Sequence, residues 1–244
     1  MSANILGHRG AMGDRPENTA VSFEKALNDG ADGIEFDVHL SSDGVPVVIH
    51  DEKVDRTTNG TGMVSRMSLK EIKELDIVIT QSQIQNKKEK VLTLEETLDL
   101  TASKSKLINI ELKQRPVIYP GLEEKVVDII KSYDIIEKVI ISSFNHYSIK
   151  MLKKKYTDIK CGLLYMAGLY QPWVYARRLG VEAIHPFFAS INEELVQACH
   201  QNNIMVNVFG SNDSANISNM LKIGVDCIIT DNPGLAVGLR EKGE

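Results

Sequence analysis

Eight short runs of mostly aliphatic residues alternate along the chain with segments of helical periodicity. We expect strands near residues 4–8, 33–38, 107–112, 138–143, 160–165, 182–186, 204–209 and 226–230. We expect helices near residues 19–29, 93–103, 120–133, 145–155, 170–179, 192–202 and 213–222, with an eighth that begins at Pro233. Alternation of this kind is typical of a parallel sheet, and eight such units in 244 residues favour a closed (β/α)8 TIM barrel over an open doubly wound sheet.

The second expected strand is followed by another extended run instead of a helix. The pair Asp43-Gly44 is favoured in two-residue hairpin turns, so the chain should fold back on itself there. With that turn, Asp37 would lie opposite His50, and opposed residues have Cβ atoms about 5 Å apart on one face. Pro46 lacks the N–H that a central strand needs, so the returning arm should lie outside the barrel. The hairpin should therefore bring a histidine back to an acidic residue.

Residues 51–92 form a second interruption, which we expect to be a small insertion between the second strand and its helix. It should contain one short helix near 68–75, capped by Ser68 with Glu71 three residues later. The polar run at 80–90 is either a rim over the strand ends or a surface loop. The whole chain should form a single domain, because 244 residues suit one barrel with one core.

Composition and charge exclude several classes of protein. Hydrophobic residues make up 43% of the chain, and no run approaches the roughly 18 apolar residues of a membrane span. A net charge of −5 gives no footprint for nucleic acid or for an anionic membrane surface. We therefore expect a small-molecule substrate, no nucleic-acid partner and no stable membrane insertion. The sequence leaves the oligomeric state open, a homo-oligomer included.

The cysteines and the first residues bear on the compartment. Cys161, Cys199 and Cys227 are far apart and lie in apolar runs, which is typical of reduced, buried thiols and not of a disulfide framework. The first ten residues contain no basic stretch followed by an apolar one, so we expect no secretory signal. Both features favour a cytoplasmic protein.

Acidic residues alternate with apolar ones along two of the expected strands. Glu35 and Asp37 do so in "GIEFDV", and Glu111 follows the same pattern in "LINIEL". Strands of a parallel barrel are covered on both faces, so charges near their carboxyl ends need partners or a ligand. Converging carboxylates repel one another without a cation, and oxygen ligation favours Mg²⁺ or Ca²⁺ over zinc. The alternative for each acid is an ion pair with Arg9 or Lys113.

Two histidines and two cations are expected beside these acids. His8 ends the first strand and His50 returns from the hairpin, and imidazole suits general acid–base work because it titrates near neutrality. Arg9 offers a planar fork for phosphate oxygens, and Lys113 offers a compact charge. Together these groups predict hydrolysis of a phosphodiester, in which charge on oxygen is stabilised and the leaving alkoxide receives a proton.

The other histidines have weaker signals. His146 and His200 lie in helical segments and are expected to be structural. His39 shares the face of Asp37 by alternation but lies further along the hairpin, so we expect it to stay away from the ligand. His185 ends the sixth strand and is a candidate for contact with the substrate.

Seven motifs, in this order, resemble those of the glycerophosphodiester phosphodiesterases. They are "GHRG" at 7–10, "PENT" at 16–19, "EFDVHLSSDGVPVVIHD" at 35–51, "RTTNGTG" at 56–62, "LTLEETL" at 92–98, "IELK" at 110–113 and "DCIITDNP" at 226–233. Single motifs such as "HRG" mean little, but the ordered combination is specific and spans nearly the whole chain. The resemblance implies a TIM barrel with a small insertion, a divalent metal, and hydrolysis of glycerophosphodiesters to glycerol 3-phosphate and an alcohol.

The resemblance also implies roles for individual residues. The general acid and base fall on His8 and His50, the metal ligands on Glu35, Asp37 and Glu111, and the phosphate contacts on Arg9 and Lys113. All of these positions hold the residue types of the family's motifs. Glu17 and Asn18 of "PENT" are expected to shape the first loop, with Glu17 near the site.

The chain departs from the family's pattern in two places. Where many relatives have a Trp-Thr-x-Asn run after strand seven, this chain has Phe209 and Gly210 in the first two positions. Phe209 can still form an apolar wall for the substrate, with a changed preference. Leu92 stands where a proline is common and should affect only the approach to the next helix. Phe144 and Tyr165 are further candidates for the glycerol side or for core packing.

Two other functions remain open at this point. A sphingomyelinase D-like phospholipase resembles the fold and places similar histidines and acids, but the cysteine pattern, the expected lack of a signal and the "RTTNGTG" segment argue against it. A catalytically silent barrel that binds a phosphorylated ligand is the other alternative, and the intact catalytic positions argue against it. The sequence does not identify the alcohol group of the substrate.

Overall fold

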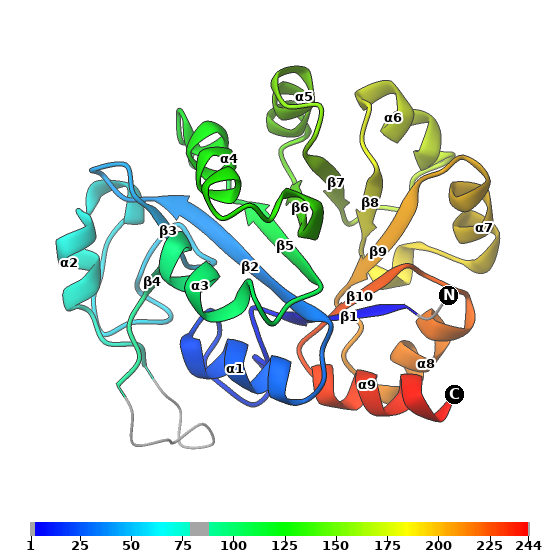
Figure 1. The fold of residues 1–244 in the computed structure, drawn as a ribbon, viewed down its shortest axis with the longest axis horizontal. Helices are drawn as coiled ribbons and strands as arrows, with labels where there is room; N and C mark the ends of the chain where they lie inside the picture. Colours follow the sequence, from blue (N-terminus) through cyan, green and yellow to red (C-terminus); the bar gives the residue numbers. More distant parts are fainter. Residues whose placement is uncertain (1–2, 79–87, 244) are drawn as a thin grey trace.

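Eight parallel strands close into a barrel in the computed structural model, which describes residues 3–78 and 88–243. The strands are β1 (Asn4–His8), β2 (Gly33–Leu40), β5 (Leu107–Leu112), β6 (Val139–Ser143), β7 (Lys160–Tyr165), β8 (Ala183–Pro186), β9 (Met205–Phe209) and β10 (Cys227–Thr230). Strand β1 closes the ring because it pairs with both β10 and β2 (Figure 1). The predicted (β/α)8 TIM barrel is confirmed.

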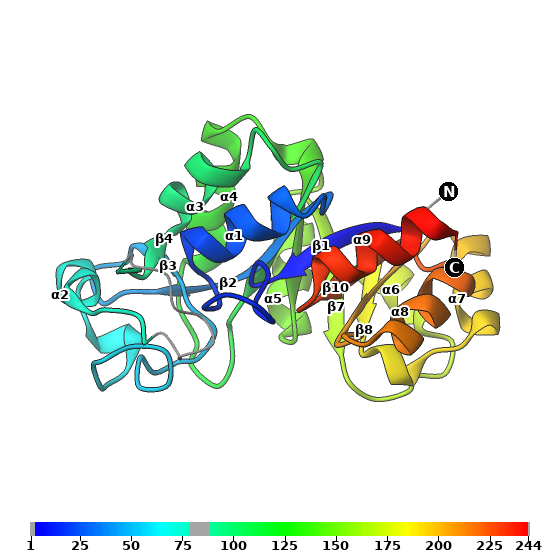
Figure 2. The ribbon, with the colours of Figure 1, turned by 90° about the horizontal axis from the view of Figure 1, so that it is seen from below.

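Helices connect the barrel strands and cover their outer side (Figures 1 and 2). They are α1 (Ala20–Asn28), α3 (Leu94–Thr101), α4 (Leu122–Ser132), α5 (His146–Lys155), α6 (Pro172–Leu179), α7 (Glu193–Gln201), α8 (Ser214–Lys222) and α9 (Pro233–Lys242), with short 3₁₀ helices η1 (Val64–Arg66), η3 (Ile136–Lys138) and η4 (Phe188–Ser190). Thr19 and Asp213 cap α1 and α8 by accepting a hydrogen bond from a backbone N–H of the first turn. Asn232 precedes α9 without capping it, since its side-chain amide donates to the backbone oxygen of Asn212. Within residues 3–78 and 88–243, none of the helices has the length and hydrophobicity that crossing a bilayer requires.

Alternation along β2 separates the apolar core from the functional face. Ile34, Phe36 and Val38 belong to the main core between strands and helices, and the Phe36 ring lies 5.9 Å from that of Phe23 in α1. Fully burying a side chain of this size contributes about 1.5–3 kcal/mol. Because the apolar residues are fixed outward, the acidic residues between them must point into the barrel.

The hairpin after β2 forms outside the barrel, but the register that the sequence predicted is wrong by one residue. Strand β3 (Pro46–Val48) pairs antiparallel with β2, and Val38 lies opposite Val48. The loop has three residues, because the N–H of Gly44 donates to the oxygen of Ser41 and Gly44 has a left-handed φ of 78°. This is a type I turn followed by a glycine bulge, which competes with the two-residue turn for Asp-Gly sequences. Asp37 and His50 are therefore not directly opposed.

The insertion has a small apolar core of its own, separate from the main one. That core consists of Val47, Ile49, Val54, Val64, Ile72 and Val91. Its helix α2 (Leu69–Glu74) begins with the expected capping box between Ser68 and Glu71. Strand β4 (Leu92–Thr93) then pairs with β3 and leads into α3. Most of the polar run at 80–90 lies outside the described residues.

A close contact between neighbouring strands gives a test of the barrel. A Cβ on Gly33 would lie 1.7 Å from the carbonyl oxygen of Leu107. We expect Gly33→Ala to lower the free energy of unfolding by about 3 kcal/mol or more, because the backbone of β5 must move. Urea denaturation followed by circular dichroism measures this change.

Gly238→Ala is the matched control for that substitution. Apart from its chain neighbours and the backbone of its own helix, no atom of residues 3–78 and 88–243 lies within 4 Å of the Cβ position of Gly238 in α9. Alanine is favoured over glycine inside a helix by about 1 kcal/mol, so this variant should be at least as stable as the parent. Equal stability of the two variants would contradict the close packing of β2 on β5.

Candidate active site

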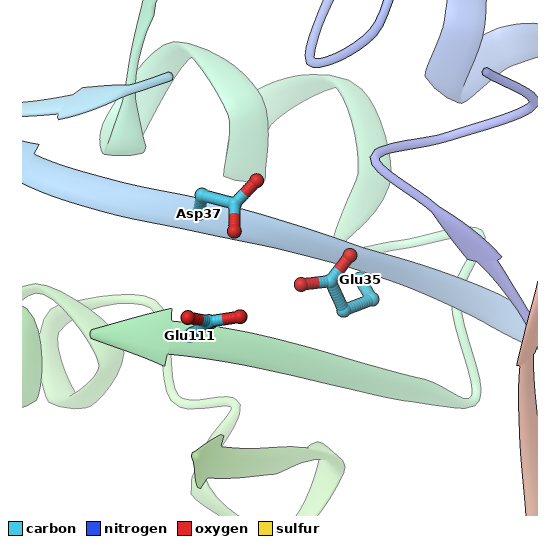
Figure 3. Close-up of side chains that lie close together, drawn as sticks. All are labelled: Glu35, Asp37 and Glu111. Atoms are coloured by element: carbon cyan, nitrogen blue, oxygen red, sulfur yellow. The ribbon is translucent and has the colours of Figure 1, made fainter. Parts of the chain in front are cut away.

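Three buried carboxylates meet inside the barrel between β2 and β5. Glu35 and Asp37 come from β2, and Glu111 lies beside Asp37 in the parallel register of β5. One carboxylate oxygen from each residue lies within 4.8 Å of the other two. Figure 3 shows the three groups facing the same space between the two strands. The structure therefore brings together all three acids that the sequence selected.

Two cations and an amide surround Asp37. Lys113 Nζ lies 2.9 Å from Asp37 Oδ1, Arg9 Nε lies 3.4 Å from Asp37 Oδ2, and the amide of Asn18 donates to Oδ2 at 2.9 Å. Burial disfavours the charged carboxylate, but Lys113 and Arg9 outweigh it and hold the pKa of Asp37 well below its usual range. Lys113 also lies 2.6 Å from Glu111. Asp37 and Glu111 therefore form ion pairs with Lys113, which is the alternative to metal ligation that the sequence left open.

Glu35 has less positive charge around it than its two neighbours. It accepts a hydrogen bond from the backbone N–H of Arg9 at 3.0 Å, and His8 Nε2 lies 4.0 Å away. Burial, followed by the charge of Asp37 and then that of Glu111, raises the pKa of Glu35 to about 8. A divalent cation among the three carboxylates would remove this penalty. An all-oxygen donor set of this charge fits a hard ion such as Mg²⁺ or Ca²⁺.

Each of the two candidate catalytic histidines is hydrogen bonded through Nδ1 to a carboxylate. His8 Nδ1 lies 2.6 Å from Asp231 Oδ1, and His50 Nδ1 lies 2.6 Å from Asp51 Oδ1. A carboxylate partner places the proton of a neutral imidazole on Nδ1 and leaves Nε2 as the acceptor. Burial lowers the pKa of His8, but the bond to Asp231 and the charge of Glu35 raise it more, so the net change is upward.

Sequence reasoning did not select the two carboxylates that orient the histidines. Asp51 directly follows His50, and Asp231 follows the last barrel strand in the quoted motif "DCIITDNP". Both acids could have been selected from the sequence, Asp51 because it is next to a candidate catalytic histidine and Asp231 because it stands at the carboxyl end of a barrel strand. Pairing across 223 residues of sequence, from His8 to Asp231, becomes visible only when β1 and β10 are neighbours.

The first loop holds Arg9 against the acids. Arg9 and Asn18 both have left-handed backbone conformations, with φ of 51° and 57°, and the N–H of Asn18 donates to the oxygen of Arg9 at 3.0 Å. The Arg9 guanidinium donates to Glu17 at 2.9 Å. The residues of "HRG" and "PENT" thus form one structural unit. As expected, Glu17 lies beside the site.

A cavity of about 200 Å³ opens above these groups. Its polar lining includes His8, Arg9, Glu35, His50, Asn109, Glu111 and Lys113, and its apolar lining consists of Phe144, Leu164, Phe209 and Ile229. The polar lining can bind a charged group and the apolar lining an aliphatic one. Phe209 lies in the apolar lining, and the ring of Phe144 lies 6.1 Å from it.

Comparison with known proteins identifies the family. Residues 8–235 match the model of the glycerophosphoryl diester phosphodiesterase family. The chain belongs to this family. A protein described as a glycerophosphodiester phosphodiesterase, from Caldanaerobacter subterraneus subsp. tengcongensis, is 45% identical and aligns over 100% of both chains. Another of the same description, from Bacillus altitudinis, is 40% identical over 98% of both.

Solved structures of glycerophosphodiester phosphodiesterases and related enzymes share this fold. A putative glycerophosphoryl diester phosphodiesterase from Silicibacter pomeroyi superposes with a TM-score of 0.89 at 25% identity, covering 99% of this chain and 94% of that one. A phosphodiesterase from Oleispira antarctica superposes with a TM-score of 0.87 at 27% identity, covering 98% and 97%. That structure holds the product sn-glycerol-3-phosphate.

One departure from the family pattern has a local explanation. Gly210 follows Phe209 with a left-handed φ of 83°, and a Cβ there would lie 2.7 Å from the ring of Phe187. The Phe187 ring in turn lies 5.8 Å from that of Phe209. A threonine at position 210 would therefore require Phe187 to move. The Phe209-Gly210 pair and Phe187 form one packed set at the edge of the cavity.

The structure does not bring His185 to the cavity, which corrects the sequence-based choice of this residue as a substrate contact. The His185 side chain is fully buried and does not line the cavity, and its Nε2 lies 3.0 Å from the amide of Asn207. A Cβ on Gly162 would lie 2.2 Å from the ring, so His185 fills the barrel interior beside that glycine. Burial lowers the pKa of His185 to about 3 and keeps it neutral. The His185 side chain points into the barrel, as strand alternation predicts, but it lies in the core and does not reach the cavity.

The remaining histidines support local structure. His39 is buried, with Nδ1 2.8 Å from the hydroxyl of Tyr119 and Nε2 3.0 Å from the backbone oxygen of His50. It therefore fixes the chain that carries His50. His146 Nε2 lies 2.8 Å from the oxygen of Leu164, and His200 pairs with an aspartate on the surface.

The interior position of His185 can be tested by stability alone. We expect His185→Leu to lower the free energy of unfolding by about 1–3 kcal/mol, because the buried amide of Asn207 loses its partner. The double variant His185→Leu/Asn207→Leu should recover part of this loss, since both polar groups are then absent. Urea denaturation measures all three proteins. An unchanged single variant would show that His185 is not paired in the core.

Proposed function

We propose that this phosphodiesterase catalyses metal-dependent hydrolysis of glycerophosphodiesters to sn-glycerol 3-phosphate and an alcohol, with His8 and His50 as general acid and base. The observation that carries the proposal is that both histidines line one cavity with Glu35 and Glu111 of the carboxylate cluster, each histidine oriented by its own aspartate. Family membership supports the reaction class. The product sn-glycerol-3-phosphate in the Oleispira antarctica structure supports the substrate class.

Glu35, Asp37 and Glu111 would hold the divalent ion, Mg²⁺ or Ca²⁺. When bound, such an ion supplies charge stabilisation at a phosphate oxygen. Lys113 and Arg9 balance the remaining negative charge of the carboxylates and are 11% and 13% exposed at the side chain. We propose that both cations contact the phosphate of the substrate from the rim of the cluster.

The two histidines move the protons of the reaction at Nε2. One accepts a proton from the attacking water, whose oxygen forms the new bond to phosphorus. The other donates a proton to the alkoxide that leaves as the old P–O bond breaks. The bonds from Nδ1 to Asp51 and Asp231 leave Nε2 of each ring for this exchange. The ring that acts as base starts neutral with its proton on Nδ1, and the ring that acts as acid starts as the imidazolium with both nitrogens protonated. The apolar wall with Phe209 and Phe144 would contact the carbon atoms of glycerol or of the alcohol.

The cysteines are consistent with a reducing compartment. Cys161, Cys199 and Cys227 are free and buried. We propose the cytoplasm as the site of action, because reduced thiols persist there.

The assigned mechanism predicts an activity and its loss. Purified protein with Mg²⁺, Ca²⁺ or Mn²⁺ should release glycerol 3-phosphate from glycerophosphocholine or glycerophosphoethanolamine, and chelation should abolish the release. We expect His8→Ala and His50→Ala to lower kcat by about 10²–10⁴-fold. His200→Ala is the control, because this histidine lies on the surface away from the cavity.

Other outcomes of the same assay would redirect the assignment. Full activity in both cavity variants would rule out the proposed proton transfers. Release of choline from sphingomyelin would favour the sphingomyelinase D-like alternative. Calorimetric binding of glycerophosphodiesters without cleavage under all three metals would favour the silent barrel.

The metal site predicts a binding constant that can be measured without substrate. Titration calorimetry should detect one divalent ion per chain, and Glu35→Gln should weaken its affinity by roughly tenfold or more because one of the anionic ligands is lost. Glu24→Gln, on the exposed face of α1, should leave the affinity unchanged. Equal affinity in the Glu35 and Glu24 variants would remove Glu35 from the ligand set.

A further inference from the structure

The insertion contributes an arginine that joins two parts of the candidate active site. Arg56 donates from Nε and Nη2 to Asp51, at 2.7 and 3.1 Å, and from Nη1 and Nη2 to Glu17, at 2.6 and 2.8 Å. Asp51 is the carboxylate that holds Nδ1 of His50, and Glu17 is the carboxylate that holds the guanidinium of Arg9. One side chain therefore fixes both carboxylates in a four-bond arrangement.

The motif "RTTNGTG" at residues 56–62 builds the turn that presents this arginine. Both the backbone N–H and the hydroxyl of Thr58 donate to the oxygen of Val54, at 3.0 and 2.8 Å, which closes a turn around Arg56. Val54 and Thr58 are buried on either side of it. The N–H of Gly60 then donates to the Thr58 hydroxyl at 3.1 Å. The buried residues fix the backbone, so Arg56 projects from a rigid base.

The far side of the motif is anchored as well. The N–H of Asn59 donates to the backbone oxygen of Asp76 at 3.0 Å, and the N–H of Asp76 donates to Oδ1 of Asn59 at 2.9 Å. A Cβ on Gly60 would lie 2.6 Å from Leu75, so the chain passes close to the end of α2. The turn is thus tied to the small core of the insertion, and the position of Arg56 depends on the fold of that core.

We propose that Arg56 is a positioning residue, which holds His50 through Asp51 and Arg9 through Glu17 and so makes the insertion part of the catalytic apparatus. This inference rests on the proposed function, in which His50 transfers a proton and Arg9 contacts phosphate. The Arg56 side chain is 49% exposed and does not line the cavity, so it acts through its partners and not on the substrate. A guanidinium can bridge two carboxylates with paired bonds, whereas an ammonium cannot.

The kinetic test compares Arg56→Ala and Arg56→Lys with a matched control in the same insertion. Arg66 is exposed, and the described part of the chain offers it no ion pair or side-chain hydrogen bond, so Arg66→Ala is that control. We expect Arg56→Ala to lower kcat/KM on a glycerophosphodiester by about 10–100-fold, since a small misplacement of catalytic groups has effects of this size. Arg56→Lys should recover only part of the loss, and Arg66→Ala should match the parent protein.

The second readout does not depend on activity or on metal. Long-range ¹H–¹⁵N correlation spectra of the metal-free protein distinguish the two neutral tautomers of His50, with the signal assigned by its absence in His50→Ala. In the parent protein His50 should carry its proton on Nδ1, facing Asp51. Asp51→Asn should change the tautomer, and Arg56→Ala should change it in the same direction, because Asp51 is then free to turn away.

The two readouts separate the inference from the proposed function. An unchanged His50 tautomer in Arg56→Ala would overturn the inference, whether or not activity falls. An unchanged kcat/KM in that variant would overturn it as well. If the parent protein cleaves no glycerophosphodiester but Arg56→Ala still alters the tautomer, the positioning of His50 stands and the proposed function fails.

Discussion

The structure of the site depends on the concentration of negative charge inside the barrel. Three carboxylates from neighbouring strands lie buried within 4.8 Å of one another, and such an arrangement is unfavourable unless positive charge compensates it. Lys113 and Arg9 compensate Asp37, and Lys113 compensates Glu111, while Glu35 keeps an excess that a divalent ion would neutralise. Glu35, whose pKa is raised, also lines the cavity, because its side chain points from β2 into the barrel.

The two histidines are supported in different ways, although each is bonded through Nδ1 to an aspartate. Asp231, the partner of His8, receives its second hydrogen bond from the amide of Asn212, so this side is built from loops of the barrel itself. Asp51, the partner of His50, is held by Arg56 of the insertion. His50 therefore depends on a second, smaller core. The insertion follows the carboxyl end of β2, so it lies next to the site.

Much of the site could be predicted from local sequence. Alternation in β2 and β5 was enough to turn Glu35, Asp37 and Glu111 to one face, because a strand places successive side chains on opposite sides. The same rule does not say how deep in the barrel a side chain lies. His185 points into the barrel, but it belongs to the core and does not line the cavity. Turn chemistry was also insufficient: "SDGV" suits two kinds of hairpin, and the glycine bulge shifted the register by one residue. Strand β3 ends at Val48, so His50 is not held in the ladder, and its side chain lines the cavity all the same.

The sequence by itself determined the eight-unit barrel, the inward direction of the acids and the residue types of the phosphodiesterase family, because these depend on periodicity and on short motifs. Only the tertiary structure decided which charges pair. Asp231 meets His8 because barrel closure makes β1 and β10 neighbours, and Arg56 meets Glu17 because the insertion folds back over the first loop. Such contacts join residues far apart in the chain through the geometry of the closed sheet, and no local pattern of residues encodes a distance across it.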